Sequence, residues 1–459
     1  MKLIITCLFI CWTGLVSAQN SPVPILHTSS DSLIMYLDGQ KDEFNGVNKI
    51  GSQFNYSFVV TTDSSVFALV SKSDSISIIL KPKKNSVFKI ARESKGDTVT
   101  CIFTTQKYVK PATFSDKYKT DNKGKTIIEI PEVYELINII IAFTEFGKTG
   151  VINRDTEYYK KIIEHFTPYN KDAAVSTVDS LLKIAPDFYY YYLKMDSYAF
   201  VFSGNKIING GVYDRPGGGE RNVLEYYIPA LQDFAIKSGF REFYTRQSNY
   251  YSELKKDYIN TVNIASMKDW LGKQFPTTRY SATKVIFSPL VGWNQSANFF
   301  SDNGFTEAHA HVNFPFVNKD DKKLPAGILK GQRMKIAFTE INHGYINPEA
   351  EKYRKLIDSV FKDLSKWTTI GKPSSSYITP LTCFEEYMNW GLVTLYYSDI
   401  FDKKAFNTLN TGTEKTMVEL RGFQRYKEFN QQLLRLYQNR KSGQTVADLY
   451  PAIIEWAAK

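Results

Sequence analysis

A change in residue pattern near Pro131 most constrains the fold of this chain. Before it, short β-branched and aromatic runs are separated by Ser, Asp, Lys and Gly clusters, a pattern that predicts short strands. After it, long segments typical of helices dominate, and residues 201–219 contain glycine turns that predict a hairpin. Two further strands are predicted at 283–290 and 307–314, with a polar loop between them. The sequence therefore predicts an α+β protein. A small N-terminal antiparallel β domain would occupy residues 19–130, and an α-rich domain with a small sheet would occupy residues 131–459.

Residues 1–18 have the pattern of a signal peptide. Lys2 gives a short basic region, an apolar stretch follows, and Val16-Ser17-Ala18 forms a small-residue cleavage site, so that Gln19 would begin the mature chain. No later apolar run is long enough to span a membrane. We therefore expect an exported protein, periplasmic or extracellular, with no transmembrane segment.

Charge and cysteine content exclude two classes of protein. The net charge of +10 is spread over short runs, and no dense basic block alternates with aromatic residues, so a nucleic-acid partner is not expected. Only Cys101 and Cys383 follow the predicted signal peptide, which excludes a disulfide scaffold. One disulfide and two buried free thiols both remain open.

Residues 331–348 read GQRMKIAFTEINHGYINP and predict a largely buried helix that ends before Pro348. Within it, Thr339-Glu340-Ile341-Asn342-His343 differs by one residue from HExxH. An intact HExxH helix places two histidines on one face to hold zinc, and its glutamate acts as general base. Here Thr339 stands at the first histidine position. The structural alternative is that Glu340 and His343 only hydrogen-bond to each other or to neighbouring strands.

Three further side chains are candidate metal ligands. Glu386 lies in a later apolar helix, where it is either a ligand or a helix-capping acid. Alternation along the strand at 307–314 places His309 and His311 on one face, so either could replace the missing imidazole. The alternative is a histidine pair that lines a polar groove. Catalytic zinc usually has three protein ligands, and the hydroxyl of Thr339 is a poor one.

Five segments between about Pro131 and Asp399 carry a resemblance to known proteins: IPEVYEL at 130–136, FSPLVG at 287–292, HVNFPF at 311–316, FTEINHGYINP at 338–348 and EEYMNW at 385–390. In these segments the chain resembles a bacterial family of secreted zincin-like, HExxH-type metallopeptidases known as a domain of unknown function. The resemblance implies that Glu340 is the general base and that His343 and Glu386 are zinc ligands. Thr339 departs from the family pattern, which puts zinc binding in question.

Two functions follow as expectations, and both have a peptide or protein partner. With zinc bound, the metal and Glu340 would activate a water molecule that attacks a peptide bond, as in a metallopeptidase hydrolase. Without metal, the same zincin fold would be a catalytically inactive protein that binds a peptide or glycan. The sequence has no GxSxG motif, so a serine nucleophile is not expected.

Overall fold

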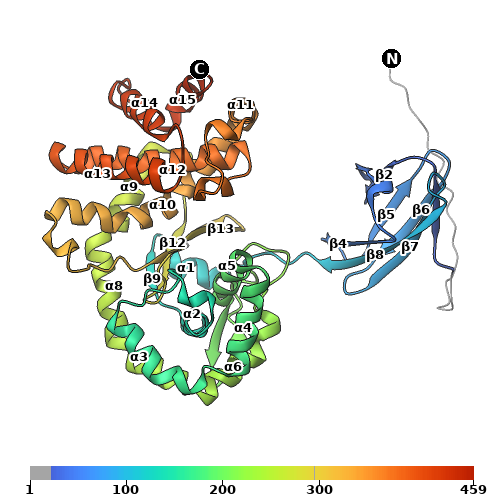
Figure 1. Cartoon of the computed structure of the whole chain (residues 1–459), viewed down its shortest axis with the longest axis horizontal. Coiled ribbons are helices and arrows are strands. Elements are labelled where there is room, and N and C mark those ends of the chain that lie inside the picture. The colour runs from blue at the N-terminus through green and yellow to red at the C-terminus, as the bar shows by residue number, and fades with distance from the viewer. Residues whose placement is uncertain (1–21, 294) are drawn as a thin grey trace. The chain divides into compact units, whose positions relative to one another are not determined.

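The computed structural model describes residues 22–293 and 295–459 (Figure 1). Helices and strands are both present in it, which confirms the predicted α+β class. Contacts divide the chain into two compact units, the first ending at Val109 and the second beginning at Lys110. The expected signal peptide lies outside the described residues. No helix in the described part of the chain is long and apolar enough to cross a membrane.

The first unit consists of two four-stranded sheets that share one apolar core. One sheet, in the order β3-β2-β5-β6, is antiparallel as predicted. The other, β1-β7-β8-β4, differs from the prediction, because β1 pairs with β7 and β4 pairs with β8 in parallel. Strands so far apart in the sequence are not joined by a hairpin, so nothing imposes antiparallel pairing on them. The strands are β1 Ile25–Thr28, β2 Ser32–Leu37, β3 Gln40–Asn45, β4 Gln53–Val60, β5 Ser65–Val70, β6 Ser75–Leu80, β7 Asn85–Arg92 and β8 Asp97–Lys107.

Aromatic rings from both sheets fill this core. The ring of Phe103 on β8 lies 5.2 Å from that of Phe67 on β5 and 4.8 Å from that of Phe88 on β7. All three side chains are buried, together with Cys101. Burying several aromatic side chains supplies much of the favourable free energy of folding in a unit of this size.

The second unit contains a mixed sheet in the order β13-β14-β12-β9. β9 and β14 both run parallel to the central strand β12, and the edge strand β13 runs antiparallel to β14. β12 and β14 match the predicted strands, whereas β13 lies in a segment that we expected to be a loop. The strands are β9 Thr126–Glu129, β12 Ala282–Ser288, β13 Ser296–Asp302 and β14 Phe305–Asn313.

The pairing of β9 explains where the two units meet along the chain. The sequence pattern places the boundary at residue 130, but β9 pairs with β12, far along the chain. Residues 110–130 therefore belong to the second unit, and the contact boundary lies between Val109 and Lys110.

Helices make up most of the second unit, with a small two-stranded sheet of β10 Phe200–Ser203 and β11 Lys206–Asn209. The helices are α1 Asp116–Asn122, α2 Glu132–Ala142, α3 Glu157–Phe166, α4 Ala173–Ile184, α5 Pro186–Asp196, α6 Ile228–Lys237, α7 Phe240–Arg246, α8 Ser248–Val262, α9 Ile264–Gln274, α10 Ala326–Lys352, α11 Arg354–Val360, α12 Pro380–Ile400, α13 Lys403–Lys415, α14 Tyr426–Gln438 and α15 Tyr450–Ala457.

Helix α10 is longer than predicted, because it continues through Pro348 to Lys352. Proline has no N–H, so Pro348 cannot bond to the carbonyl of Gly344, four residues earlier. The hydroxyl of Tyr280 donates to that carbonyl at 2.7 Å instead. A side chain outside the helix thus satisfies the freed acceptor, and the helix does not have to end.

Candidate functional site

Helices α10 and α12 lie against each other and bring three predicted residues together (Figure 1). Glu340 and His343 come from α10, and Glu386 comes from α12. The Nε2 atom of His343 lies 3.8 Å from Oε2 of Glu386. Burial raises the pKa of Glu340 to about 7, against a lowering effect of His343. The sequence prediction that these three residues share one site agrees with this geometry.

Both ring nitrogens of His343 have hydrogen-bond partners. The side-chain amide of Asn389 lies 2.7 Å from Nε2, and Nδ1 lies 3.2 Å from Oδ1 of Asn347. An amide nitrogen only donates, so Nε2 is the acceptor and Nδ1 carries the proton that goes to Asn347. The nitrogen that faces Glu386 is therefore already engaged by Asn389.

Glu386 is paired with an arginine. Nη2 of Arg421 lies 2.8 Å from Oε1 of Glu386, and the indole nitrogen of Trp390 donates to the same oxygen at 2.9 Å. Burial alone would raise the pKa of Glu386, but Arg421, His343 and Trp390 outweigh burial and lower it. Glu386 is thus an ionised, buried carboxylate whose counter-charge comes from the protein itself.

Thr339, at the position of the missing histidine, turns back onto its own helix. Its hydroxyl donates to the backbone carbonyl of Ile336 at 2.8 Å and lies 3.3 Å from Oε1 of Glu340. Threonine in a helix commonly makes this bond to the preceding turn. The hydroxyl supplies no free donor to the space between His343 and Glu386.

His309 and His311 lie on the face of the sheet opposite to α10. The rings of the two histidines are 6.0 Å apart on that face, and the ring of His309 lies 5.1 Å from that of Tyr213. On the other face, Phe299, whose partner on β14 is the residue before His309, lies against α10. A β-carbon at Gly344 would be 2.7 Å from the Phe299 ring. The structure places both histidines on one face, as predicted, but does not bring them to His343.

These side chains do not fit a zinc site. Thr339 is bonded to its own helix, Nε2 of His343 to Asn389, and Glu386 to Arg421. A divalent cation next to Glu386 would also lie close to the guanidinium, and two like charges repel at that separation. Among the described residues, no group of three or more His, Cys, Asp and Glu side chains could hold a metal ion.

Sequence reasoning missed the two side chains that decide this geometry. Arg421 follows a π-helical turn and stands in no motif, and Asn389 looks like an ordinary residue of the apolar helix α12. The spacing of Asn389 three residues after Glu386 does place both on one helix face, which is the single signal available. For Arg421 the sequence carries no signal that we can identify.

Comparison with known proteins gave no match: no family model, no curated protein and no solved structure matches this chain. The resemblance to zincin-like metallopeptidases therefore stays a prediction.

Proposed function

We propose that the second unit binds an extended polypeptide segment without a metal ion and without hydrolysing it. The ion pair between Glu386 and Arg421 is the observation that carries this proposal. A zinc peptidase needs Glu386 as a ligand, and here the arginine neutralises it. The expected metallopeptidase activity has no complete donor set among the residues that we predicted for it.

The edge strand β13 is the binding surface in this proposal. β13 pairs with β14 on one side, and no described residue makes a backbone hydrogen bond to its outer side. An extended peptide can add to such an edge as a further strand, because its main chain pairs with the unsatisfied N–H and C=O groups. Phe299 of β13 is 39% exposed and offers an apolar contact there.

Helix α10, which carries His343, packs against this edge strand. Phe299 contacts Gly344, the residue after His343. The side chains of His343 and Arg421 are 21% and 22% exposed, so each can meet a ligand while it keeps its internal partner. A bound peptide would thus have main-chain bonds from β13 and polar side-chain contacts from this site.

Metal content tests the first half of the proposal. We expect the purified full chain, incubated with zinc and then desalted, to retain less than about a tenth of an equivalent by mass spectrometry. His343→Ala should not change that value. One equivalent of zinc in the wild type, lost in His343→Ala, would overturn the metal-free assignment.

Peptide binding tests the second half. The probe is reduced and carboxymethylated lactalbumin, an unstructured polypeptide, labelled with fluorescein and followed by anisotropy. Phe299→Lys should weaken its binding at least about fivefold, because an edge lysine opposes strand addition. Ile236→Lys, at a similarly exposed apolar position on α6, is the matched control and should bind like the wild type.

Equal affinity of Phe299→Lys and the wild type, or no binding by the wild type, would refute strand addition at β13. Circular dichroism establishes that each variant is folded. Should Phe299→Lys unfold, Ser301→Lys repeats the test at another exposed position of the same strand.

A further inference from the structure

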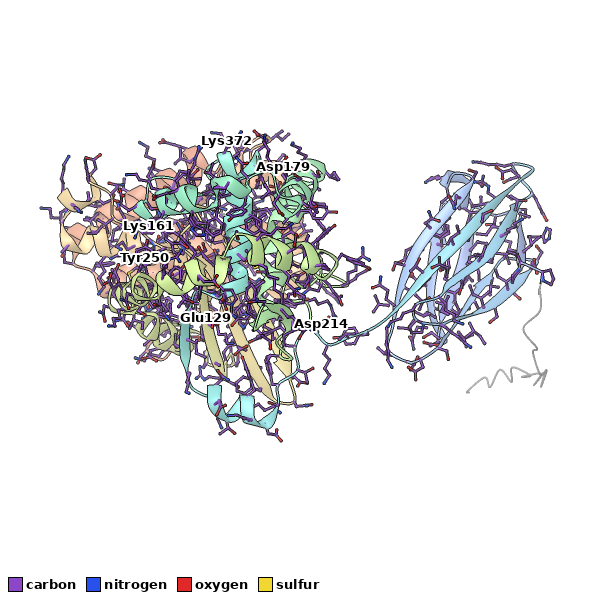
Figure 2. The ribbon with its side chains drawn as sticks, turned by 90° about the horizontal axis from the view of Figure 1, so that it is seen from below. Glu129, Lys161, Asp179, Asp214, Tyr250 and Lys372 are labelled. Atoms are coloured by element: carbon purple, nitrogen blue, oxygen red, sulfur yellow. The ribbon has the colours of Figure 1, made fainter. Side chains whose placement is uncertain are left out.

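A pocket lies on the face of the β13-β14-β12-β9 sheet that carries His309, opposite to the face covered by α10. It has a volume of about 340 Å³. Its polar lining includes Glu129, Lys284 and three tyrosines, and its apolar lining includes Phe200 and Phe202. Glu129 is the last residue of β9 and is labelled in Figure 2. None of these residues takes part in the site between α10 and α12.

The amine of Lys284 already occupies an aromatic cage next to this pocket. Its Nζ lies between 5.2 and 5.3 Å from the ring centres of Tyr118, Tyr198 and Tyr213, and it donates to the hydroxyl of Tyr198 at 2.9 Å. Only 8% of the Lys284 side chain is exposed. Because the cation lies over these rings, they do not offer a free platform on which a sugar ring could stack.

Glu129 is the charged group that a ligand would meet. Its side chain is 33% exposed, four times as much as that of Lys284. Oε1 accepts a hydrogen bond from Tyr198 and lies 3.9 Å from Nζ of Lys284. Among the described residues, no hydrogen bond or ion pair reaches Oε2 of Glu129. This oxygen remains available to a donor in the pocket.

The charge of the surroundings favours a cation. Glu132 also lines the pocket and pairs with Arg241 at 2.8 Å. Behind the tyrosines, Glu307 accepts a hydrogen bond from Tyr118 at 2.8 Å, and the bonded His309 helps to keep the pKa of Glu307 low, at about 2. Three carboxylates thus face two cations, Lys284 and Arg241, although the whole chain has a net charge of +10.

We propose that this pocket binds a primary ammonium group carried on a short apolar chain. The ammonium donates to Glu129, and the apolar chain lies against Phe200 and Phe202. An anion would have to approach Glu129 and Glu132, and its natural partner Lys284 is enclosed by tyrosines. The ligand class is therefore an alkylammonium compound, such as a small amine or a lysine-like side chain.

Titration calorimetry of the full chain with three small probes tests this assignment. n-Butylammonium should bind, whereas n-butanol, which lacks the charge, and butyrate, which reverses it, should bind at least about tenfold more weakly. Butyrate binding as tightly as butylammonium would overturn the proposal, and so would the absence of any heat with butylammonium.

Two variants locate the site. Glu129→Gln removes the charge and keeps the shape, so butylammonium should bind about tenfold more weakly. Glu145→Gln is the control, because Glu145 lies in an exposed ion pair with Lys148 and does not line the pocket. Val201→Trp, at an exposed position of the pocket wall, should block binding even if Glu129→Gln does not fold. Unchanged affinity in either pocket variant would refute the site.

Discussion

The guanidinium of Arg421 is held by three different side chains. It bonds to Glu386 and to the hydroxyl of Tyr377 at 2.9 Å, and it lies 5.1 Å from the centre of the Trp390 ring. These contacts fix a positive charge beside a carboxylate that is only 4% exposed. At the scale of single residues, the ion pair between Arg421 and Glu386 is the main difference between this structure and the zinc site that the sequence suggests.

Replacing Arg421 by methionine should destabilise the protein by about 3 kcal/mol near neutral pH, because it leaves a buried carboxylate without a counter-charge. The pKa of Glu386 is lower in the folded chain than in the unfolded chain, so its ionised form stabilises the wild type at pH values above the ordinary pKa of a glutamate. This stabilisation is lost as the pH falls through the lowered pKa of Glu386. The deficit of the variant should therefore shrink below about pH 4. Urea unfolding at several pH values measures both effects.

Arg421→Lys is the matched control for this variant, since it keeps the charge but loses the planar fork. We expect it to cost less than half as much free energy as Arg421→Met. In the double variant Arg421→Met with Glu386→Gln, part of the loss should be recovered. A deficit that is the same with and without Glu386→Gln would show that the ion pair is not its cause.

The raised pKa of Glu340 leads us to expect a second pH dependence of stability, opposite in sign to that of Glu386. Its pKa is about 7 in the folded chain and near 4.5 as an ordinary side chain, so the folded state holds the proton longer than the unfolded state does. This contribution is fully present below about pH 4.5 and is lost as the pH rises towards 7. Glu340 is half-buried, and solvent screening leaves a decline of about 1 kcal/mol.

The variant Glu340→Gln has no proton to lose there, so its stability should fall less than that of the wild type between pH 5 and pH 7.5. Thermal unfolding in buffers with matched heats of ionisation shows the difference. Parallel curves for the two proteins would contradict the raised pKa of Glu340.

Part of the site could be predicted from the sequence. The period of a helix places Glu340 and His343 on neighbouring turns of one face. A second apolar helix that carries a buried acid suggests that Glu386 lies in the same site as these two residues. Strand alternation also gives the shared face of His309 and His311. Alternation relates residues of a strand only to one another, so it cannot tell which face the helix α10 covers. Arg421 reaches the site through tertiary packing alone.

At the scale of elements, the contact of α10 with β13 depends on the absence of a side chain at Gly344. A β-carbon there would be 2.7 Å from Phe299 and 2.8 Å from the hydroxyl of Tyr280. That hydroxyl also satisfies the carbonyl freed by Pro348. Gly344 thus allows α10 to pack closely on β13, and its carbonyl, bonded to Tyr280, allows α10 to continue through Pro348.

We expect Gly344→Ala to lower the free energy of unfolding by about 2 kcal/mol, although alanine is the better helix former. Gly412→Ala on α13 is the control, because no neighbouring atom lies within 4 Å of the added carbon. It should stabilise the chain by about 0.5 kcal/mol. Chemical denaturation measures both, and a stabilising Gly344→Ala would contradict the close packing of α10 on β13.

Elements were predicted unevenly, and the reasons are physical. β12 is rich in β-branched and aromatic residues, and β14 has a clear alternation of His309 and His311 with small or apolar residues, so both were recognised. β13 reads Ser-Ala-Asn-Phe-Phe-Ser-Asp, which has weak alternation, and its pairing with β14 decides its conformation. The sequence prediction ended α10 too early because it rested on the preference of the residue before a proline for extended backbone. That preference contains no information about the hydroxyl of Tyr280, which bonds to the carbonyl of Gly344.

At the scale of the whole molecule, each unit has its own apolar core. The α+β class follows from the sequence pattern, since local periodicity changes along the chain. The boundary does not, because β9 and its partner β12 are separated by most of the helices. A pairing of such long range leaves no local mark on either strand.

Limited digestion with trypsin should cut first at the end of the first unit, after Lys107. This residue ends β8, and the exposed Tyr108 and Val109 follow it. Exposed chain at the end of a compact unit is a preferred site of cleavage. Mass spectrometry should find an intact fragment that begins at Tyr108, and Lys107→Gln should remove this first cut. A first cut elsewhere would show that the connection is protected.

Within residues 22–293 and 295–459, each unit encloses one cysteine, Cys101 in the first and Cys383 in the second, and neither forms a disulfide. Burial raises the pKa of both thiols to about 12, so neither reacts with an alkylating reagent while its unit stays closed. A thiol becomes modified only when the surrounding core opens. Alkylation followed by peptide mass spectrometry would therefore report the opening rate of each unit separately, in one sample of the unaltered chain.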